Sequence, residues 1–558
     1  MEDNGTPVAP SRKRTAADAP DDGERTSKRA RSNRKLALED VSRVGPDGRR
    51  QLYVPAQLIG SSMCSEEEIV GAVCHHMRTG DIPVPGVRDV LSAQEVVNRM
   101  IRFEELELHL VASDTRGAMP PCLHLTDREL AYRGPRPRPQ TGRVTPLWAC
   151  DHPDAEVESH VTAHAPGAPC EQQHEPSAPR EAGGAPRDRD SSSARSVVAS
   201  TVGPADRPGW YDGAPCLGAV TFCTWYETYH VIANWFTESQ RMRAKSGRSS
   251  MSPHDYVRTR AGCSAVLAEA LSRYGRLDPA SFREASYHRV KQCETFKTAL
   301  AYLLYTRVFG ATSVLDPCAG WGDRLVAALA ARIRYVGVDA NSRLIPLYRD
   351  IIDVLGGAAA ADVAALACQV FHGDFAVCCD EVVAAAASRW GGLAEGVQPT
   401  AAAAAAPFDL VFSCPPYYTE EIYSDDPEQS TARFPGVKEW TRGFLCRSAQ
   451  LAWKHLRPGG HMVFVLSDHV ARRDHGYGYC EAFVLWCQAR LDDCRFLGIL
   501  SYRAGRMLPE TGAGAGVKVS KIAQPIWVFG KGASSLPDGA LTTERALALL
   551  ERHYPELL

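Results

Sequence analysis

The chain has 558 residues, 44% of them hydrophobic, and this length allows several domains with at least one large core. Its formal net charge is −3, from 63 basic and 66 acidic side chains, so overall composition does not indicate nucleic-acid binding and any basic surface must be local. No apolar run reaches the roughly 18 residues of a membrane span, and no signal-peptide core begins the chain. We therefore expect a soluble, unsecreted protein with reduced thiols.

Residues 1–45 are polar and charged, a composition typical of a disordered basic tail. Two basic clusters in this tail, at residues 12–14 and 28–35, have the spacing of a bipartite nuclear-import signal. A solvated tail that contacts phosphates without specificity would have the same composition. The tail favours the nucleus over the cytoplasm as the location of the protein.

A small, mainly helical region is predicted over residues 46–132, with helices over residues 66–77 and 92–108. Residues 133–215 are rich in Pro, Gly, Ala and Ser and predict a disordered linker or insertion. The Cys and His residues within this segment lack the regular spacing of a zinc site, so no metal is expected.

Residues 216–290 are predicted to be helical and are a possible nucleic-acid recognition region. Aromatic residues at helical spacing over 225–236 favour a face buried in the core. The basic run that follows is the best local candidate for phosphate contacts, although a solvated face would look the same; it contains Arg241, Arg243, Lys245 and Arg248.

A strand, a glycine-bearing turn, a helix and a second strand are predicted over residues 314–339. Gly320 and Gly322 lie in the turn, and Asp339 ends the second strand. Such a unit places backbone N–H groups and a helix N-terminus beside a polar ligand, and an acid at the next strand end can accept both hydroxyls of a ribose. The predicted ligand is a nucleoside derivative.

Further alternating elements make residues 291–531 an α/β domain, followed by a C-terminal helix or tail over residues 532–558. Together they account for a Rossmann-like, doubly wound sheet of seven strands. Helices are predicted over residues 295–309 and 342–355, and a further helix after residue 418 ends at residue 455. Strands are predicted over residues 368–371, 409–412, 461–466, 496–502 and 525–529.

Two segments carry a resemblance to a known family. The first runs from Asp316 to Asp339 and begins Asp-Pro-Cys-Ala-Gly-Trp-Gly-Asp-Arg-Leu, and the second is Ser-Cys-Pro-Pro-Tyr-Tyr at residues 413–418, continued at 421–427 as Glu-Ile-Tyr-Ser-Asp-Asp-Pro. This pair resembles motifs I and IV of class I S-adenosylmethionine-dependent methyltransferases. Within that class it is similar to the DNA amino-methyltransferases of phages and large DNA viruses, over roughly residues 290–531.

The resemblance implies S-adenosylmethionine as cofactor, an antiparallel pair as the last two strands, and nucleic acid as partner, with DNA favoured over RNA. A viral protein of this kind would act in the nucleus or cytoplasm of the host cell. Cofactor contacts are implied for Phe296, Lys297, Asp316, Cys318, Ala319, Gly320, Trp321, Gly322, Asp339, Ala340, Asp374 and Phe375. The implied catalytic residues are Ser413, Cys414, Pro415, Pro416 and Tyr417, and the implied substrate-binding residues are Tyr418, Glu421, Tyr423 and Ser424.

The implied reaction methylates an exocyclic amine, adenine N6 or cytosine N4. Such a nitrogen is a poor nucleophile, and two acceptors that hold its hydrogens favour attack on the methyl group. In the resembled enzymes these acceptors are a side-chain oxygen before the prolines and the first proline carbonyl, while an aromatic ring stacks on the flipped base. The roles fall here to Cys414, the Pro415 carbonyl and Tyr417. A thiol is a weak acceptor, so the Cys414 carbonyl or the Ser413 hydroxyl would have to compensate.

Other functions stay open. The same motifs suit an RNA base N-methyltransferase, or a catalytically silent module that only binds nucleic acid. Methylation of cytosine C5 is disfavoured because two prolines follow Cys414, whereas that chemistry uses a Pro-Cys pair; Pro317-Cys318 has this order but lies in the cofactor turn. The residues that follow motif IV would either order a lid over the flipped base or cap the next helix.

Overall fold

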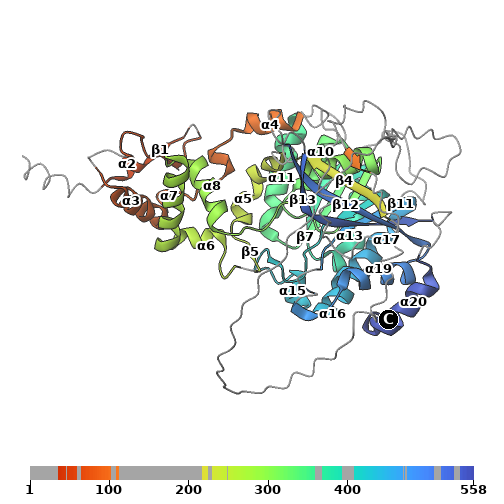
Figure 1. Ribbon diagram of the computed structural model, residues 1–558. Helices are drawn as coiled ribbons and strands as arrows, with labels where there is room; N and C mark the ends of the chain where they lie inside the picture. Colours follow the sequence, from red (N-terminus) through yellow and green to blue (C-terminus); the bar gives the residue numbers. More distant parts are fainter. Residues whose placement is uncertain are drawn as a thin grey trace, which may run out of the picture.

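The computed structural model describes residues 36–45, 47–59, 64–101, 109–111, 216–223, 229–247, 249–358, 367–391, 407–468, 471, 474–507, 517–532 and 541–558. The two predicted basic clusters near the N-terminus and the predicted linker therefore lie outside the described residues. Figure 1 shows a helical body beside a larger body built on one sheet. Within the described residues, no helix has the length and apolar character to cross a membrane.

The central sheet has nine strands in the order β3-β4-β12-β13-β11-β9-β6-β7-β8. Its parallel part, from β11 to β8, has the doubly wound order in which the first strand in sequence, β6, lies in the middle. The antiparallel strands β12 and β13 complete the seven-stranded α/β sheet that the sequence predicts. The bounds of these strands are β6 Ser313–Asp316, β7 Arg334–Asp339, β8 Cys368–His372, β9 Phe408–Ser413, β11 Leu456–Val465, β12 Cys494–Met507 and β13 Val517–Lys531.

Two further strands, β3 (His109–Val111) and β4 (Cys216–Cys223), extend the sheet beyond β12. The prediction that residues 216–290 begin as a helical region is therefore wrong at its start. The reason is tertiary: β12 is long, and its residues Ile499 to Gly505 offer a free edge with which β4 pairs in parallel. β3 then pairs antiparallel with β4.

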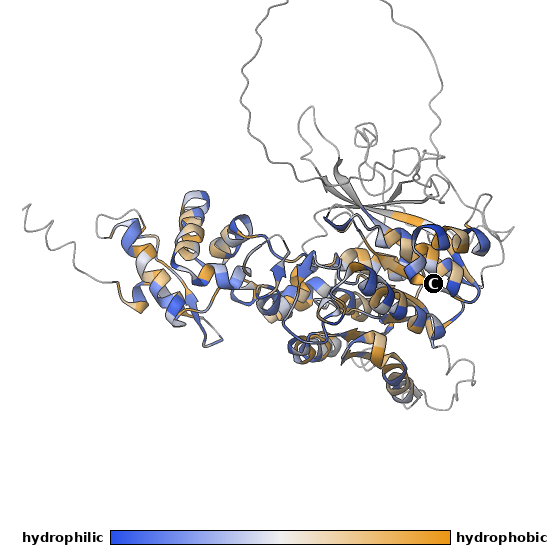
Figure 2. Ribbon diagram, turned by 90° about the horizontal axis from the view of Figure 1, so that it is seen from below, coloured by the Kyte–Doolittle hydropathy of each residue, from blue (hydrophilic) through white to orange (hydrophobic). Residues whose placement is uncertain are grey.

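Helices cover both faces of the sheet, and successive strand residues point to opposite cores. On β6, Val314 belongs to one core and Leu315 to the other. The first core contains the helices α5 (His230–Arg241), α9 (Thr298–Leu303), α10 (Asp323–Ala330) and α11 (Ile345–Ala358), and the second contains α13 (Phe375–Gly391), α17 (Arg447–Lys454), α19 (Tyr479–Arg490) and α20 (Thr543–His553). Figure 2 shows hydrophobic residues on these flanking helices.

The predicted helix over residues 295–309 has two parts. It begins as α9 and continues as a π-helical turn, η7 (Leu304–Val308), with η7 also buried in the first core. Residues 295–297 precede α9 without regular secondary structure, and the Phe296 ring lies 5.7 Å from that of Phe412 on β9. Within the predicted C-terminal helix or tail, Thr543–His553 form α20.

The helical body consists of residues 36–84 and 253–289, which share one core. It contains α2 (Leu38–Val41), a hairpin of β1 (Ser42–Val44) and β2 (Arg50–Leu52), α3 (Glu66–Thr79), α6 (Pro253–Arg258), α7 (Arg260–Tyr274) and α8 (Pro279–Arg289). The sequence sets the ends of α3: the Ser65 hydroxyl accepts the Glu68 N–H at 3.2 Å, and Gly80 ends the helix at φ +88°.

This shared core corrects two predictions about organisation. The disordered tail does not extend to residue 45, because Leu36 and Val41 are buried against α3 and its neighbours. The regions 46–132 and 216–290 are also not separate bodies, since each contributes helices to the helical body. Helix α4 (Ala93–Ile101), by contrast, packs on α5 and α11 of the sheet body.

Candidate functional site

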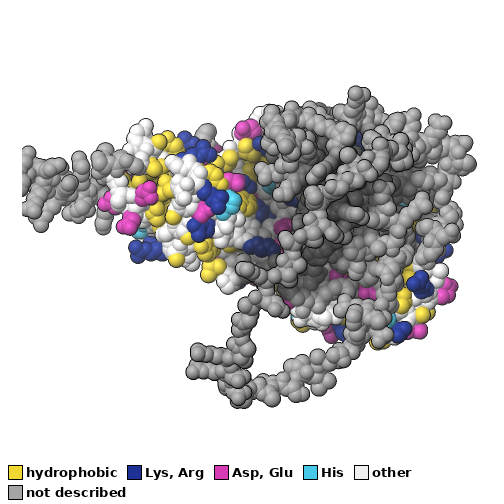
Figure 3. Space-filling view, in the orientation of Figure 1, with side chains coloured by type: hydrophobic (Ala, Val, Ile, Leu, Met, Phe, Trp, Pro, Cys, Tyr) yellow, Lys and Arg dark blue, Asp and Glu magenta, His cyan; other side chains and the backbone are white. Residues whose placement is uncertain are grey.

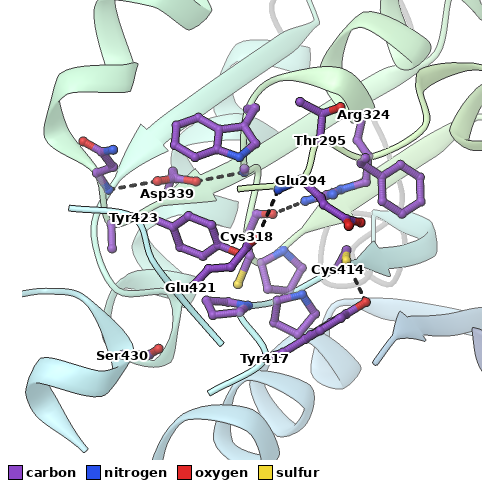
Figure 4. A pocket seen from close by; sticks show the side chains of 18 of the residues that line it. Glu294, Thr295, Cys318, Arg324, Asp339, Cys414, Tyr417, Glu421, Tyr423 and Ser430 are labelled. Carbon is purple, nitrogen blue, oxygen red and sulfur yellow. Dashed lines mark hydrogen bonds between the residues drawn. The ribbon is translucent and has the colours of Figure 1, made fainter. Parts of the chain in front are cut away.

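A cavity of about 520 Å³ lies at the carboxyl ends of β6, β7, β8 and β9. It includes the boundary between β6 and β9, where the order of the parallel strands reverses direction, and this is where open α/β sheets bind ligands. Figure 4 shows the side chains of the turn after β6 and those of the segment after β9 facing one another across this space. Its volume is in the range of small-molecule and cofactor sites.

Most of the residues implied by the resemblance line this cavity. They are Phe296, Lys297, Cys318, Gly320, Trp321, Asp339, Ala340, Asp374, Phe375, Cys414, Pro415, Pro416, Tyr417, Glu421 and Tyr423. Six others do not line it, namely Asp316, Ala319, Gly322, Ser413, Tyr418 and Ser424. Four of the six have polar side chains with contacts elsewhere, and Ala319 and Gly322 shape the backbone of the turn.

Asp316 is fully buried behind the cavity wall, and all its acceptor capacity is used inside the protein. Its carboxylate accepts Arg324 Nε at 2.7 Å, the Tyr335 hydroxyl at 2.7 Å, the Ser413 hydroxyl at 2.9 Å and the Cys318 N–H at 3.2 Å. Asp316 therefore joins the first motif to the second. The suggestion that the Ser413 hydroxyl compensates for Cys414 is wrong, because that hydroxyl is buried and donates to Asp316.

Glycine is required in the turn after β6. Gly320 and Gly322 have φ angles of +66° and +92°, which L side chains rarely adopt. A Cβ on Gly322 would also lie 2.8 Å from Ile351 Cδ1, because α11 passes close by. Gly322 and Ala319 thus shape the backbone of the turn; the Ala319 N–H donates to the Val338 carbonyl at 2.8 Å.

Asp339, at the end of β7, is held in place by two backbone donors. Its carboxylate oxygens accept the Gly320 N–H at 2.8 Å and the Asn341 N–H at 2.9 Å. Burial raises its pKa to about 6, and the carboxylate lines the cavity. Each oxygen retains a lone pair, so the arrangement can accept two vicinal hydroxyls, as a ribose would require.

Asp374 follows β8 and faces the same cavity. One of its oxygens accepts the Ala376 N–H at 2.9 Å, and the other accepts the guanidinium of Arg433, which ends the short helix α15 (Ser430–Arg433). Burial raises the pKa of Asp374, and Arg433 opposes that effect. Sequence reasoning missed Arg433 because it lies 59 residues further along the chain.

The segment after β9 places Cys414, Pro415, Pro416 and Tyr417 in the cavity wall. The Cys414 thiol lies 3.6 Å from the Tyr417 hydroxyl, and burial raises the pKa of both groups, so both are protonated at neutral pH. Tyr418 turns away instead, with a φ of +55°. Its hydroxyl donates to the Pro435 carbonyl and its ring lies 5.8 Å from that of Trp440, so its predicted substrate contact is wrong.

The residues after motif IV are tied to other parts of the chain. The Tyr423 ring lies 5.6 Å from that of Trp321, and its hydroxyl donates to Glu421 Oε2 at 2.7 Å. Glu421 Oε1 accepts the Glu294 N–H at 2.9 Å. Ser424, in contrast, accepts the Asp426 N–H at 3.2 Å and stabilises a turn outside the cavity, and its substrate contact stays a prediction.

A two-residue antiparallel ladder also holds the segment after motif IV in place. β10 (Glu421–Ile422) pairs antiparallel with β5 (Lys245–Ser246), and the Gly247 N–H donates to the Glu420 carbonyl at 2.6 Å. We call β5, β10 and Gly247 the strap. The strap joins the cavity rim to the chain that follows α5.

The basic residues at the end of α5 and just after it differ in burial. Arg241 is 3% exposed and donates to Asn234, Gln292, Tyr287 and Glu238, so its predicted phosphate contact is wrong. Arg243 and Lys245 are exposed, and Arg248 lies outside the described residues. The aromatic stripe before this run is core as predicted, since Tyr229, Ile232 and Phe236 are buried.

Several lining residues were missed by sequence reasoning. Asp323 and Arg324 stand within the quoted motif and could have been found there. Pro317 stands in the same motif, and Thr295, Asn341, Gly373 and Glu420 are chain neighbours of implied residues. The fold alone brings in the others, which are Lys291, Glu294, Leu300, Leu344, Glu428, Gln429, Ser430, Phe444, Ser467 and Gln524.

No family model matches this sequence, and no curated protein is significantly similar to it. Similarity to solved structures is weak. TrmN from Thermus thermophilus is 14% identical with a TM-score of 0.25, over 42% of this chain and 49% of TrmN, so the chain spans about half of that protein. NSun6 from Pyrococcus horikoshii is 12% identical with a TM-score of 0.24, over 44% of this chain and 53% of NSun6. An S-adenosylmethionine-dependent O-methyltransferase from Thermotoga maritima is 10% identical with a TM-score of 0.25, over 45% and 72%. At these scores the likenesses carry no argument about function.

Proposed function

We propose that this chain is an S-adenosylmethionine-dependent methyltransferase that methylates an exocyclic amine of a DNA base, adenine N6 or cytosine N4. One observation carries the proposal: a single cavity joins the nucleoside cradle of Gly320 and Asp339 to the segment Cys414 to Tyr417. A cofactor held by the first would present its reactive group to a base held by the second.

The residues present fit this cofactor. Asp339 offers carboxylate oxygens for the ribose hydroxyls, and Asp374 and Phe375 line the neighbouring end of the cavity, where a purine would lie. When bound, S-adenosylmethionine supplies an electrophilic methyl group to the attacking nitrogen. With the strand order β9-β6-β7-β8, the nucleoside end would lie over β7 and β8 and the reacting end beside β9.

The residues after β9 would orient the base amine. The Pro415 carbonyl accepts a hydrogen bond from one N–H of the amine, and the Tyr417 ring stacks on the flipped base. Because the Cys414 thiol is protonated and weak as an acceptor, the Cys414 carbonyl is the remaining candidate for the second hydrogen. Positioning of the amine would supply most of the acceleration.

The state of the thiols supports amine methylation over attack through cysteine. A nucleophilic cysteine needs an accessible thiolate with a lowered pKa. Burial instead raises the pKa of both Cys414 and Cys318, the two cysteines in the cavity wall. Both thiols are therefore poor nucleophiles at neutral pH.

The test is to incubate the full chain with methyl-labelled S-adenosylmethionine and unmethylated DNA or RNA, and to identify labelled nucleosides by mass spectrometry. We expect label in N6-methyldeoxyadenosine or N4-methyldeoxycytidine. Tyr417→Ala should lower turnover at least a hundredfold, whereas Tyr274→Ala, at a partly exposed tyrosine of the helical body, should leave turnover unchanged. Label only in RNA would replace DNA by RNA as substrate, and cofactor binding without any label would favour a silent binding module.

A further inference from the structure

Asp323 is a buried carboxylate with one unused oxygen. It is the first residue of α10, directly after Gly322, and is only 1% exposed. Its Oδ1 accepts the Thr298 hydroxyl at 2.7 Å, while its Oδ2 is buried and has no hydrogen-bond partner. A buried oxygen of this kind costs stability when it stays unpaired, so its retention calls for an explanation.

The position of Asp323 in the helix does not explain it. An acid in the first turn of a helix is stabilised by the helix dipole, but this benefit is equally available to a solvated side chain. Three cations lower the pKa of Asp323; Lys297 lines the same cavity, and the other two are paired elsewhere. Arg324 is held by Asp316, and Arg241 by Glu238 and its other partners.

Asp323 also lines the cavity that we assign to the cofactor. In the order of the strands, Asp374 follows β8, Asp339 follows β7, Asp323 follows the turn after β6, and Cys414 follows β9. A nucleoside held by Asp339 thus extends past Asp323 before it reaches Cys414. The part of S-adenosylmethionine found there is its amino-acid chain, which carries an α-ammonium group.

We infer that Asp323 Oδ2 accepts a hydrogen bond from the α-ammonium group of the cofactor's amino-acid chain. The Thr298 hydroxyl holds Oδ1, so Oδ2 is the oxygen left to pair with the ammonium group. The inference rests on the proposed function only for the identity of the cofactor. It does not depend on which nucleic acid is methylated.

The experiment is calorimetric titration of the full chain with three ligands. S-adenosylhomocysteine has the ammonium, its desamino analogue lacks only that group, and 5′-deoxy-5′-methylthioadenosine lacks the whole amino-acid chain. A charge-assisted hydrogen bond to a buried carboxylate corresponds to roughly a 10- to 100-fold change in affinity. We expect Asp323→Asn to lower the affinity for S-adenosylhomocysteine by that factor and to leave the affinities for the other two ligands unchanged.

Matched variants identify the cause. Asp339→Asn should weaken all three ligands, because each contains the ribose. Thr298→Val should weaken S-adenosylhomocysteine less than Asp323→Asn does, and should spare the desamino analogue. Unchanged methylthioadenosine binding by Asp323→Asn and Thr298→Val also demonstrates that these two variants are folded.

Two results would overturn the inference. One is equal weakening of all three ligands by Asp323→Asn, and the other is unchanged binding of S-adenosylhomocysteine. Failure of the wild-type chain to bind any of the ligands would reject the cofactor and this inference together. Normal binding with the expected pattern, but no methylated nucleoside, would reject only the proposed reaction.

Discussion

Asp323 affects stability in the cofactor-free protein as well as binding. Burial raises its pKa to about 7, above the 3.8 of an ordinary Asp, so the folded state binds its proton more tightly than the unfolded state. Its contribution to stability is therefore present below pH 4 and is lost as the pH rises through about 7. Asp323→Asn removes this dependence.

The comparison is urea unfolding of the wild type and Asp323→Asn at pH 5 and pH 8. We expect the free energy of unfolding of the wild type to fall, relative to the variant, by on the order of a few kcal/mol between these pH values. If the free energies of unfolding of the two proteins change equally between pH 5 and pH 8, Asp323 has an ordinary pKa. Saturating S-adenosylhomocysteine should reduce the difference in the free energy of unfolding between the wild type and Asp323→Asn at pH 8.

Cys414 gives a second prediction at the scale of single residues. Cys414→Asn supplies a neutral amide oxygen where the thiol is a weak acceptor, and it adds no charge near Asp316 and Glu421. We expect kcat to rise about tenfold with cofactor affinity unchanged. Cys414→Ala is the control and should stay within about twofold of the wild type, since the backbone carbonyl is retained. A fall in kcat for both variants would mean that the thiol itself is needed, and a fall for Asn alone would mean that the amide does not serve as the acceptor.

At the scale of elements, the strap is the feature that local sequence could not reveal. Each of its strands has two residues, far too short for periodicity to predict, and they pair across about 175 residues. The unit β6, turn, α10 and β7 was predictable because its glycines, its strand ends and Asp339 are adjacent in sequence. Tyr417 and Tyr418 mark the limit of such reasoning: the residues are identical, and only the backbone conformation decides that one faces the cavity and the other the core.

Gly247→Ala should release the strap. A Cβ at this position would lie 2.4 Å from the Thr419 carbonyl oxygen, so the chain after β5 must move away from the cavity rim. We expect KM for the nucleic acid to rise about tenfold, with the affinity for S-adenosylhomocysteine changed less than twofold. Kinetics and calorimetry on the same preparation measure both. Gly71→Ala, at a glycine of α3 without a positive φ and with nothing within 4 Å of the added Cβ, controls for the loss of a glycine.

At the scale of the whole molecule, residues 216–290 belong to both bodies. They contribute β4 and α5 to the sheet body and α6, α7 and α8 to the helical body, so their removal would unfold the protein. The sequence could not predict this division, because it depends on contacts with residues 36–84. Figure 3 shows both signs of charge interspersed on the helical body, consistent with the small net charge.

A basic contact with nucleic acid is therefore best sought next to the strap. Lys245 belongs to the strap and Arg243 precedes it by two residues, and both are exposed. Lys291 lines the cavity. We expect the double variant Arg243→Ala, Lys245→Ala to bind DNA about tenfold more weakly at low salt and to have a smaller salt dependence. Fluorescence anisotropy over a salt series measures this. The exposed pair Arg49 and Arg276 on the helical body is the control, and an equal loss from its Ala variants would indicate nonspecific charge.

The pairing of β3 with β4 has one more consequence. Val111 lies opposite Ala219, so the end of β3 lies beside β4 at one edge of the sheet, and the segment 112–215 connects these two neighbouring strands in sequence. Replacing it with a short turn would leave every other strand in place and shorten the loop whose closure opposes folding. Alternatively, the polypeptide can be cut there, and we expect the two fragments, co-expressed, to reassemble into one working sheet.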